Sequence, residues 1–168
     1  MRRDPGAVGE RAGRRALTVL DPNVRTSLIA DRAAYMHRLE RALRRTDVLK
    51  ASEEDLAWID PELDPEAAAR KLLQSGPAVA LVTRGAEGAL VVSADDAVAV
   101  SSPPVEVVDT IGAGDAFTGG FLASWLHRGL GRDRLADRDA VTESAEFACV
   151  VASRTCERAG ADPPRLTL

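Results

Sequence analysis

The sequence predicts an α/β fold in which helices cover a mostly parallel β-sheet. Short apolar segments alternate with longer amphipathic ones along the chain, the order typical of strands and helices packed in layers. Residues 77–82 (PAVALV) are continuously apolar, as expected for a strand covered on both faces. Two more apolar segments flank Asp95 and Asp96, and so short a connection favours an antiparallel hairpin. We therefore expect a mixed sheet with this hairpin toward one edge.

The first two predicted elements are a strand and a helix. Residues 16–20 (ALTVL) form an apolar stretch that stops at Asp21 and Pro22, which indicates a buried strand opening onto a polar loop. From Leu28 onward, apolar residues recur at helical spacing, with arginines on the opposite face. We expect one amphipathic helix over residues 27–45.

The next helices are predicted from residues typical of helix starts and helix ends. Residues 48–50 can form a brief strand, after which Ser52 has the character of an N-cap because acidic residues fill the following turn. Asp64 and Pro65 start another helix, with the proline at its first position and Gly76 marking its end. The two strands of the hairpin are residues 88–92 and 97–100.

One further strand and two helices complete the prediction. We expect a strand over residues 105–108, then a glycine-rich turn, then a helix with one apolar side. That side consists of Phe117, Phe121, Leu122, Trp125 and Leu126. A last helix covers residues 139–154, because small and apolar residues recur there at helical spacing. These residues are Val141, Ala145, Ala148 and Ala152.

Length and charge limit the classes of function. At 168 residues the chain accommodates one domain with a core, and a second domain of ordinary size would not fit, so we treat residues 1–168 as one unit. The formal net charge of −4 at pH 7 provides no basic field of the kind that draws a protein onto nucleic acid or an anionic membrane. Small molecules are therefore the expected partners, with no nucleic acid and no membrane.

The N-terminal segment and the cysteines indicate a reducing, cytoplasmic compartment. Residues 1–16 are arginine-rich but lack the apolar core of a secretory signal, and no apolar run approaches a membrane span. Cys149 and Cys156 are about 10.5 Å apart along a predicted helix axis, so we expect free thiols. With His37 and His127 far apart in the sequence, spacing assembles no zinc-type cluster.

The most informative segment joins a predicted strand to a predicted helix. It reads VVDTIGAGDAF, with Gly112 and Gly114 before the helix and Asp115 in its first turn. A helix N-terminus presents unpaired N–H groups and the positive end of the helix dipole, and anions bind there. We expect both glycines to let the backbone approach a phosphate closely and to adopt positive φ.

Asp115 indicates proton transfer, because a carboxylate beside a phosphate site would only repel the phosphate if binding were its whole purpose. As a base, it can accept the proton of a hydroxyl group that attacks a γ-phosphoryl group, while backbone donors stabilise the transferred oxygens. The pattern GxxxxGK[ST] is absent, and Phe117 replaces the third glycine of GxGxxG. The four residues GAGD alone leave open a tight turn in which Asp115 is only a cap.

The longer string DTIGAGDAFTGGFL resembles the C-terminal signature of the ribokinase-like (PfkB-type) carbohydrate kinases. The resemblance implies a three-layer Rossmann-like fold and an ATP-dependent sugar kinase, a phosphotransferase with an alcohol group as acceptor. It implies that Asp115 is the catalytic base and contacts the substrate. It also implies that the backbone of Gly112, Ala113 and Gly114 forms the anion hole, with Gly114 against the nucleotide.

Other segments resemble the family in the expected order. DPNVR resembles the loop of fructokinase-like members whose arginine faces the sugar, which is Arg25 here; the alternative is a surface arginine that pairs with Asp31. VTRGAEGALV resembles the nucleotide loop and implies that Thr83 and Gly85 lie along ATP. By spacing alone, RGAEG is also an ordinary hairpin turn.

The resemblance further implies metal sites. In many members the aspartate of the DT pair and a following carbonyl hold a monovalent cation such as K⁺, and these are Asp109 and Ile111 here. LKASEEDL aligns with the motif NxxE, which positions Mg²⁺ through water; Ser52 replaces its Asn, and Asp55 replaces its Glu with a side chain one methylene shorter. The alternative is a capped helix start. The loop TCERAGA resembles one that borders the adenine and implies a nucleotide contact at Gly160.

The resemblance also implies that part of the protein is absent from this sequence. Full members carry a glycine-rich sugar motif, a sugar-binding aspartate and a small β-sheet lid, and none of these precedes the first predicted strand. We therefore expect a fragment, or a half that works with another chain, with association through an exposed sheet edge, for example as a homodimer. Two functions stay open: an ATP-dependent kinase of a small sugar, with fructose favoured, and a nucleotide-binding remnant without turnover.

Overall fold

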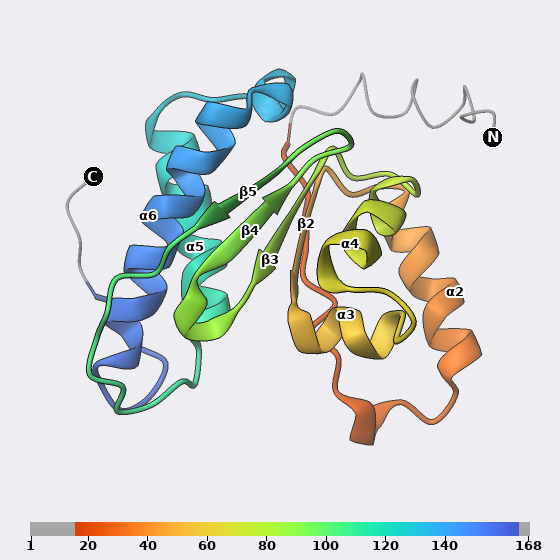
Figure 1. Cartoon of the computed structure of the whole chain (residues 1–168), viewed down its shortest axis with the longest axis horizontal. Coiled ribbons are helices and arrows are strands. Elements are labelled where there is room, and N and C mark those ends of the chain that lie inside the picture. Colours follow the sequence, from red (N-terminus) through yellow and green to blue (C-terminus); the bar gives the residue numbers. More distant parts are fainter. Residues whose placement is uncertain (1–15, 165–168) are drawn as a thin grey trace.

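A five-stranded sheet in the order β1-β2-β3-β4-β5 forms the middle of the molecule (Figure 1). The structure is a computed structural model, and it describes residues 16–164. β1, β2 and β3 run parallel, and β3, β4 and β5 are joined by antiparallel pairing. The strands are Val19–Leu20, Val48–Ser52, Val79–Thr83, Ala89–Val92 and Ala97–Val100. The predicted mixed sheet with a hairpin at one edge is confirmed.

Helices cover both faces of this sheet, which gives three layers (Figure 1). On one face lie α2 (Arg32–Leu43), α3 (Glu53–Ile59) and α4 (Pro65–Leu73). On the other face lie α5 (Ala113–His127) and α6 (Arg138–Cys156). Within residues 16–164, the connections contain three short 3-10 helices, Thr26–Leu28, Gly85–Glu87 and Arg132–Ala136. The predicted three-layer α/β fold is confirmed.

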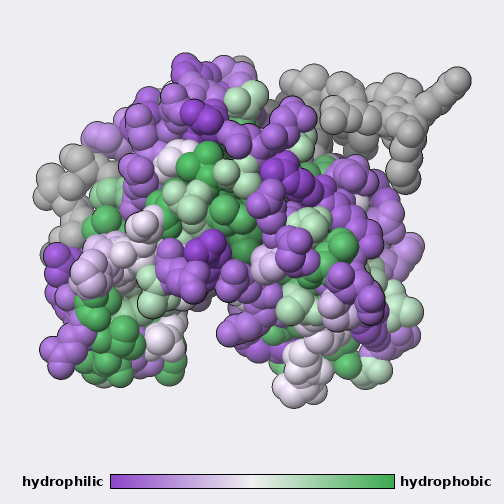
Figure 2. Space-filling view, in the orientation of Figure 1, coloured by the Kyte–Doolittle hydropathy of each residue, from purple (hydrophilic) through white to green (hydrophobic). Residues whose placement is uncertain are grey.

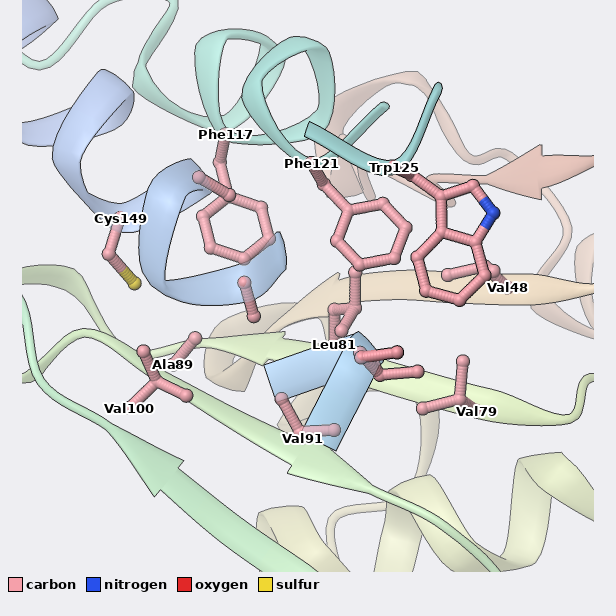
Figure 3. Close-up of a cluster of buried hydrophobic side chains, with 14 of the residues drawn as sticks. Val48, Val79, Leu81, Ala89, Val91, Val100, Phe117, Phe121, Trp125 and Cys149 are labelled. Atoms are coloured by element: carbon pink, nitrogen blue, oxygen red, sulfur yellow. The ribbon is translucent and has the colours of Figure 1, made fainter. Parts of the chain in front are cut away.

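Each face of the sheet carries its own core. Successive strand residues point to opposite faces, so Val48 packs toward α5 and α6, whereas Leu49 packs toward α2, α3 and α4. Figure 3 shows the first core, in which aromatic side chains of α5 lie over the strands. The labelled members there include Phe117, Phe121, Trp125, Val79 and Leu81. Since buried apolar surface is the main favourable term in folding, this core fixes α5 on the sheet.

The apolar side of α5 is narrower than the sequence suggested. Phe121 and Trp125 are fully buried, and their rings stack at a centroid distance of 5.6 Å. Leu126, predicted to belong to the same side, is instead 66% exposed. Next to this side, α5 packs against α6 through Gly120, where a Cβ atom would lie 2.9 Å from Cγ2 of Val151. The two helices therefore approach more closely than larger residues would allow.

The predicted helix over residues 27–45 begins too early. α2 starts at Arg32, because the Asp31 carboxylate accepts a hydrogen bond from the N–H of Ala34 and caps the helix there. The preceding residues form a 3-10 turn in which Leu28 is largely exposed. Leu28 therefore does not belong to the buried side of α2.

The predicted strand over residues 105–108 is wrong. Val107 and Val108 are 58% and 62% exposed and pair with no strand. Instead the N–H groups of Val108 and Asp109 both donate to the carbonyl of Cys156 at the end of α6. Tertiary hydrogen bonds to α6 thus take the place of the sheet pairing that the apolar sequence suggested.

Capping explains the starts of the two short helices. Ser52 and Asp55 form a reciprocal capping box at α3, and Asp64 caps α4 directly before Pro65. Both starts agree with the prediction, and α4 ends three residues before Gly76.

Two remaining expectations concern the termini of the chain and the thiols. Residues 1–15, which include nearly all of the segment tested for a secretory signal, lie outside the described residues. No helix within residues 16–164 is long and apolar enough to cross a membrane. Cys149 and Cys156 are free thiols within α6, as predicted.

Candidate active site

The predicted site residues gather at the end of the sheet where β1, β2 and β3 finish. Ser52 and Thr83 are register partners in parallel strands, so β2 and β3 end side by side. The N-terminus of α5 lies at this same lower end of the view in Figure 1. Figure 2 shows that the surface is hollowed there, between the lobe of α5 and α6 and the lobe of α2, α3 and α4. Carboxyl ends of parallel strands are the usual ligand position in such sheets.

The glycine-rich turn is built around Gly112. This residue is the N-cap of α5 and has φ of +80°, a conformation that other residues rarely adopt. A Cβ atom on Gly112 would also lie only 2.5 Å from Cβ of Ala161. The expectation of positive φ holds for Gly112 but is wrong for Gly114, which lies inside the first turn of α5.

Free backbone donors occur in this first turn. The N–H of Ala113 donates to the carbonyl of Thr110, and that of Ala116 donates to Gly112. Among residues 16–164, the N–H groups of Gly114 and Asp115 donate no hydrogen bond. Two adjacent free donors at the positive end of a 15-residue helix suit an anion.

Asp115 lies beside these donors and is exposed. Its carboxylate has no hydrogen-bond or ion-pair partner within the part of the chain that the structure describes. A carboxylate that only capped the helix would accept from a nearby backbone N–H, as Asp31 does at α2. The capping interpretation of Asp115 is therefore not what the structure shows.

A lysine reaches the same turn from the sheet. The ammonium nitrogen of Lys50, in β2, lies 3.0 Å from the position that a Cβ atom on Gly114 would occupy. Lys50 is 5% exposed, and Nζ lies 2.8 Å from Oδ2 of Asp21 in the loop after β1. Sequence reasoning missed both residues, although a charged residue within the buried segment VLKA was the available signal.

Asp109 connects the loop that follows α6 to the glycine-rich turn. The carboxylate of Asp109 accepts hydrogen bonds from the N–H groups of Ile111 at 3.0 Å and Gly160 at 2.9 Å. These backbone hydrogen bonds hold the pKa of Asp109 below its usual value. The structure thus brings Gly160, a predicted nucleotide contact, to the glycine turn.

The loop after β1 is tied to the start of α3. Oδ1 of Asp55 accepts from the N–H of Val24 at 2.7 Å, and Oδ2 accepts from the N–H of Ser52 at 2.9 Å. Both carboxylate oxygens of this buried side chain are therefore engaged. Arg25 follows directly and is exposed, and it makes no ion pair with Asp31, so the alternative surface pair is not formed.

Thr83 and Gly85 lie where β3 passes into β4. Thr83 is the last residue of β3, and Gly85 has φ of +55° in the 3-10 turn that follows. The turn also closes the antiparallel pair of β3 and β4, so the interpretation of RGAEG as a hairpin turn is compatible with a ligand contact there.

The described chain has a pocket away from these residues and no cluster of metal-binding side chains. Residues 16–164 contain no group of three or more His, Cys, Asp or Glu side chains that could hold a metal ion. A pocket of about 240 Å³ lies at the opposite end of the sheet, between the hairpin tip and α6. Its lining includes Val79, Ser93, Asp96, Arg138 and Val141, and none of the predicted site residues.

Known proteins resemble both the sequence and the structure. Residues 4–168 match the pfkB family of carbohydrate kinases. A fructokinase of Rhizobium leguminosarum bv. trifolii is 44% identical over 105 residues, which are 62% of this chain and 32% of that protein. A fructokinase of Xylella fastidiosa with bound ATP matches with a TM-score of 0.79 and 27% identity over 93% of this chain and 50% of that one.

A third match has informative ligands. A fructokinase double mutant of Vibrio cholerae O395, in fructose-, ADP- and potassium-bound form, matches with a TM-score of 0.75 and 26% identity. The match covers 85% of this chain and 45% of that one. The chain thus spans about a third of the curated relative and about half of the two solved structures.

Proposed function

The chain belongs to the pfkB family of carbohydrate kinases, and from this we propose that it transfers the γ-phosphoryl group of ATP to a hydroxyl group of a small sugar. The observation that carries the proposal is the position of Asp115. Its unpartnered carboxylate lies in the first turn of α5, beside two free backbone donors. Fructose is favoured as the sugar, because several relatives are fructokinases and one solved relative contains fructose.

In the proposed reaction, Asp115 accepts the proton of the attacking sugar hydroxyl. The sugar oxygen then forms a bond to the γ-phosphorus, the bond to the bridging oxygen breaks, and ADP leaves with that electron pair. The turn of Gly112, Ala113 and Gly114 forms the anion hole, in which the free N–H groups of Gly114 and Asp115 stabilise the transferred oxygens.

The remaining contacts divide between the two substrates. Thr83 and Gly85 at the end of β3, together with Gly160 after α6, lie along the nucleotide. Arg25 faces the sugar, because it is exposed and projects from the loop that Asp55 holds beside β2. Among residues 16–164, Arg25 has no carboxylate partner and donates only one long hydrogen bond, to the carbonyl of Val24, so most of its donors can serve a ligand.

A divalent metal would neutralise phosphate charge during transfer. Asp55 would reach Mg²⁺ only through water, since each of its oxygens already accepts a backbone hydrogen bond. The carboxylate of Asp109 and the carbonyl of Ile111 supply oxygen ligands of the kind that suits a monovalent cation such as K⁺, which one solved relative binds.

Binding and turnover are the two measurements that test this proposal. Titration calorimetry with ATP should show binding, and an assay of ADP release with a panel of hexoses should show transfer, fastest with fructose. Binding of ATP without turnover under any hexose would instead favour the second candidate, a nucleotide-binding remnant. Absence of ATP binding would refute both candidates.

The edge formed by β1 suggests association as well. β1 consists of two residues and, within the described chain, pairs only with β2, so its outer edge offers unpaired backbone groups. We propose that a second chain, such as another copy in a homodimer, pairs there. Light scattering of the purified chain should then give a mass above that of one chain.

A further inference from the structure

We propose that Tyr35 is a positioning residue for the sugar site: its hydroxyl group holds the loop of residues 21–25 in the shape that directs Arg25 toward the sugar. This inference rests on the proposed function and adds to it a residue outside the sequence motifs. Tyr35 lies in α2, an element that carries none of the other proposed substrate contacts. It acts through Arg25 and does not touch the substrate itself.

The hydroxyl group of Tyr35 reaches the loop directly. It donates a hydrogen bond to the carbonyl of Pro22 at 3.3 Å. Among residues 16–164, no other group donates to that carbonyl. A second anchor lies further along the loop at Val24, whose N–H donates to the carboxylate of Asp55. Tyr35 therefore holds a part of the loop that Asp55 does not reach.

The loop needs such an anchor, because its backbone is strained at Asn23. This residue has φ of +41°, the one positive φ of a residue other than glycine within residues 16–164. Asparagine tolerates the left-handed conformation better than most residues, but the conformation still costs free energy and persists only where neighbouring contacts impose it. The carbonyl of Pro22 belongs to the planar peptide group from which φ of Asn23 is measured. A hydrogen bond to this carbonyl therefore helps to fix the turn from which Arg25 projects.

The ring of Tyr35 is anchored in turn by α3. It meets the ring of Trp58 edge to face, at a centroid distance of 5.2 Å and an interplanar angle of 88°. The guanidinium group of Arg32 lies 5.2 Å from the centre of the Trp58 ring and donates to the carbonyls of Trp58 and Ile59. These contacts between α2 and α3 set the direction in which the hydroxyl group points before any substrate binds.

The surroundings keep this hydroxyl group protonated. Burial raises the pKa of Tyr35, and the nearby charges of Asp55 and Asp21 raise it further, whereas the charge of Arg38 lowers it. A phenol whose pKa lies above its ordinary value stays protonated over the pH range of enzyme assays. The hydroxyl group is therefore a constant donor to the carbonyl of Pro22.

The test compares Y35F, which loses the hydroxyl group and keeps the ring, with the control T46V in the full chain. Thr46 also donates from a hydroxyl group to a backbone carbonyl, that of Ala42, but it lies beyond the other end of α2. We expect Y35F to raise KM for fructose by about 3- to 10-fold, the usual worth of a neutral hydrogen bond, with kcat and KM for ATP nearly unchanged. T46V should destabilise the chain in urea at least as much, because Thr46 is buried, and should leave both KM values unchanged. An unchanged KM for fructose in Y35F, or the same rise in T46V, would overturn the assignment.

Hydrogen exchange tests the loop contact without turnover. In the ligand-free chain, Y35F should speed the exchange of the Val24 N–H by about 3- to 10-fold, because this N–H exchanges when the loop opens, and T46V should leave it unchanged. Unchanged exchange at Val24 in Y35F would refute the role of Tyr35. A wild-type chain that phosphorylates no hexose would instead overturn the proposed function, and exchange at Val24 would still decide whether Tyr35 holds the loop. The two failures are therefore distinguishable.

Discussion

Oδ1 of Asp55 accepts a hydrogen bond at 2.7 Å from the backbone N–H of Val24, which joins the start of α3 to the loop that carries Arg25. The same carboxylate closes the capping box with Ser52. One short acidic side chain therefore both begins a helix and positions the loop that carries Arg25.

The first prediction concerns the hydrogen bonds that Asp55 accepts from Val24 and Ser52. D55A should lower the free energy of unfolding by about 1–3 kcal/mol, because two backbone N–H groups lose their acceptor. E54A is the control, since Glu54 is exposed in the same helical turn and should change stability by no more than about 0.5 kcal/mol. Urea unfolding measures both. Equal free energies of unfolding for the two variants would mean that the hydrogen bonds of Asp55 do not stabilise the fold.

The second prediction concerns the base. D115N should lower sugar phosphorylation by about 10²- to 10⁴-fold, the usual contribution of a positioned general base, with little loss of ATP affinity. D139N is the matched control for D115N. Asp139 is also an acidic residue in the first turn of a helix, α6, but it lies far along the chain from the glycine turn. Steady-state kinetics that show a similar kcat for D115N and the wild type would exclude Asp115 as the base.

The third prediction separates the glycines of α5. G112A should lower the free energy of unfolding by about 1–3 kcal/mol, because alanine at φ of +80° is strained and its Cβ would overlap Ala161. G119A should instead raise it by up to about 1 kcal/mol, since Gly119 lies within the helix with open space around it. Thermal and urea unfolding give the two signs. Stabilisation by G112A would show that the turn is not left-handed there.

The fourth prediction uses the thiols. Burial raises the pKa of Cys149 to about 11, with a further contribution from the charge of Glu146, and burial together with Asp109 also raises the pKa of Cys156. Thiolate is the reactive form, so at pH 8 the buried Cys149 should remain unmodified by iodoacetamide. Cys156, which is partly exposed, should react slowly, and mass spectrometry distinguishes the two. In urea both should react alike; faster labelling of Cys149 in the folded chain would contradict its burial.

Local signals predicted the parts of the fold that local interactions determine. Ser52 and Asp64 marked helix starts correctly, because a cap acts within one turn of the chain. The prediction of the helix over residues 27–45 failed at its beginning, since apolar spacing counted Leu28 as helical, whereas Asp31 caps the helix and Leu28 precedes it. The strand over residues 105–108 failed because its hydrogen bonds go to Cys156, which lies far away in the sequence.

The sequence likewise predicted the part of the site that lies in one contiguous segment, but not the contacts between distant segments. The glycines and Asp115 form one contiguous segment, so the pattern itself identified the turn. Lys50 was not predictable as a neighbour of Gly114, because their approach depends on how α5 crosses the sheet above β2. For Asp55 the sequence left open a contact to Mg²⁺ through water and a capped helix start; the structure shows the capped start, and the magnesium contact stays a prediction.

The close contact of α5 and α6 at Gly120 has a consequence for ligand affinity. The close approach of α5 to α6 at Gly120, together with the hydrogen bond from the N–H of Gly160 to Asp109, holds the turn at the N-terminus of α5 beside the loop after α6. A ligand that touches both Gly114 and Gly160 would then restrict little additional motion. The entropy of ordering these two segments is lost when the protein folds, and binding does not have to supply it again.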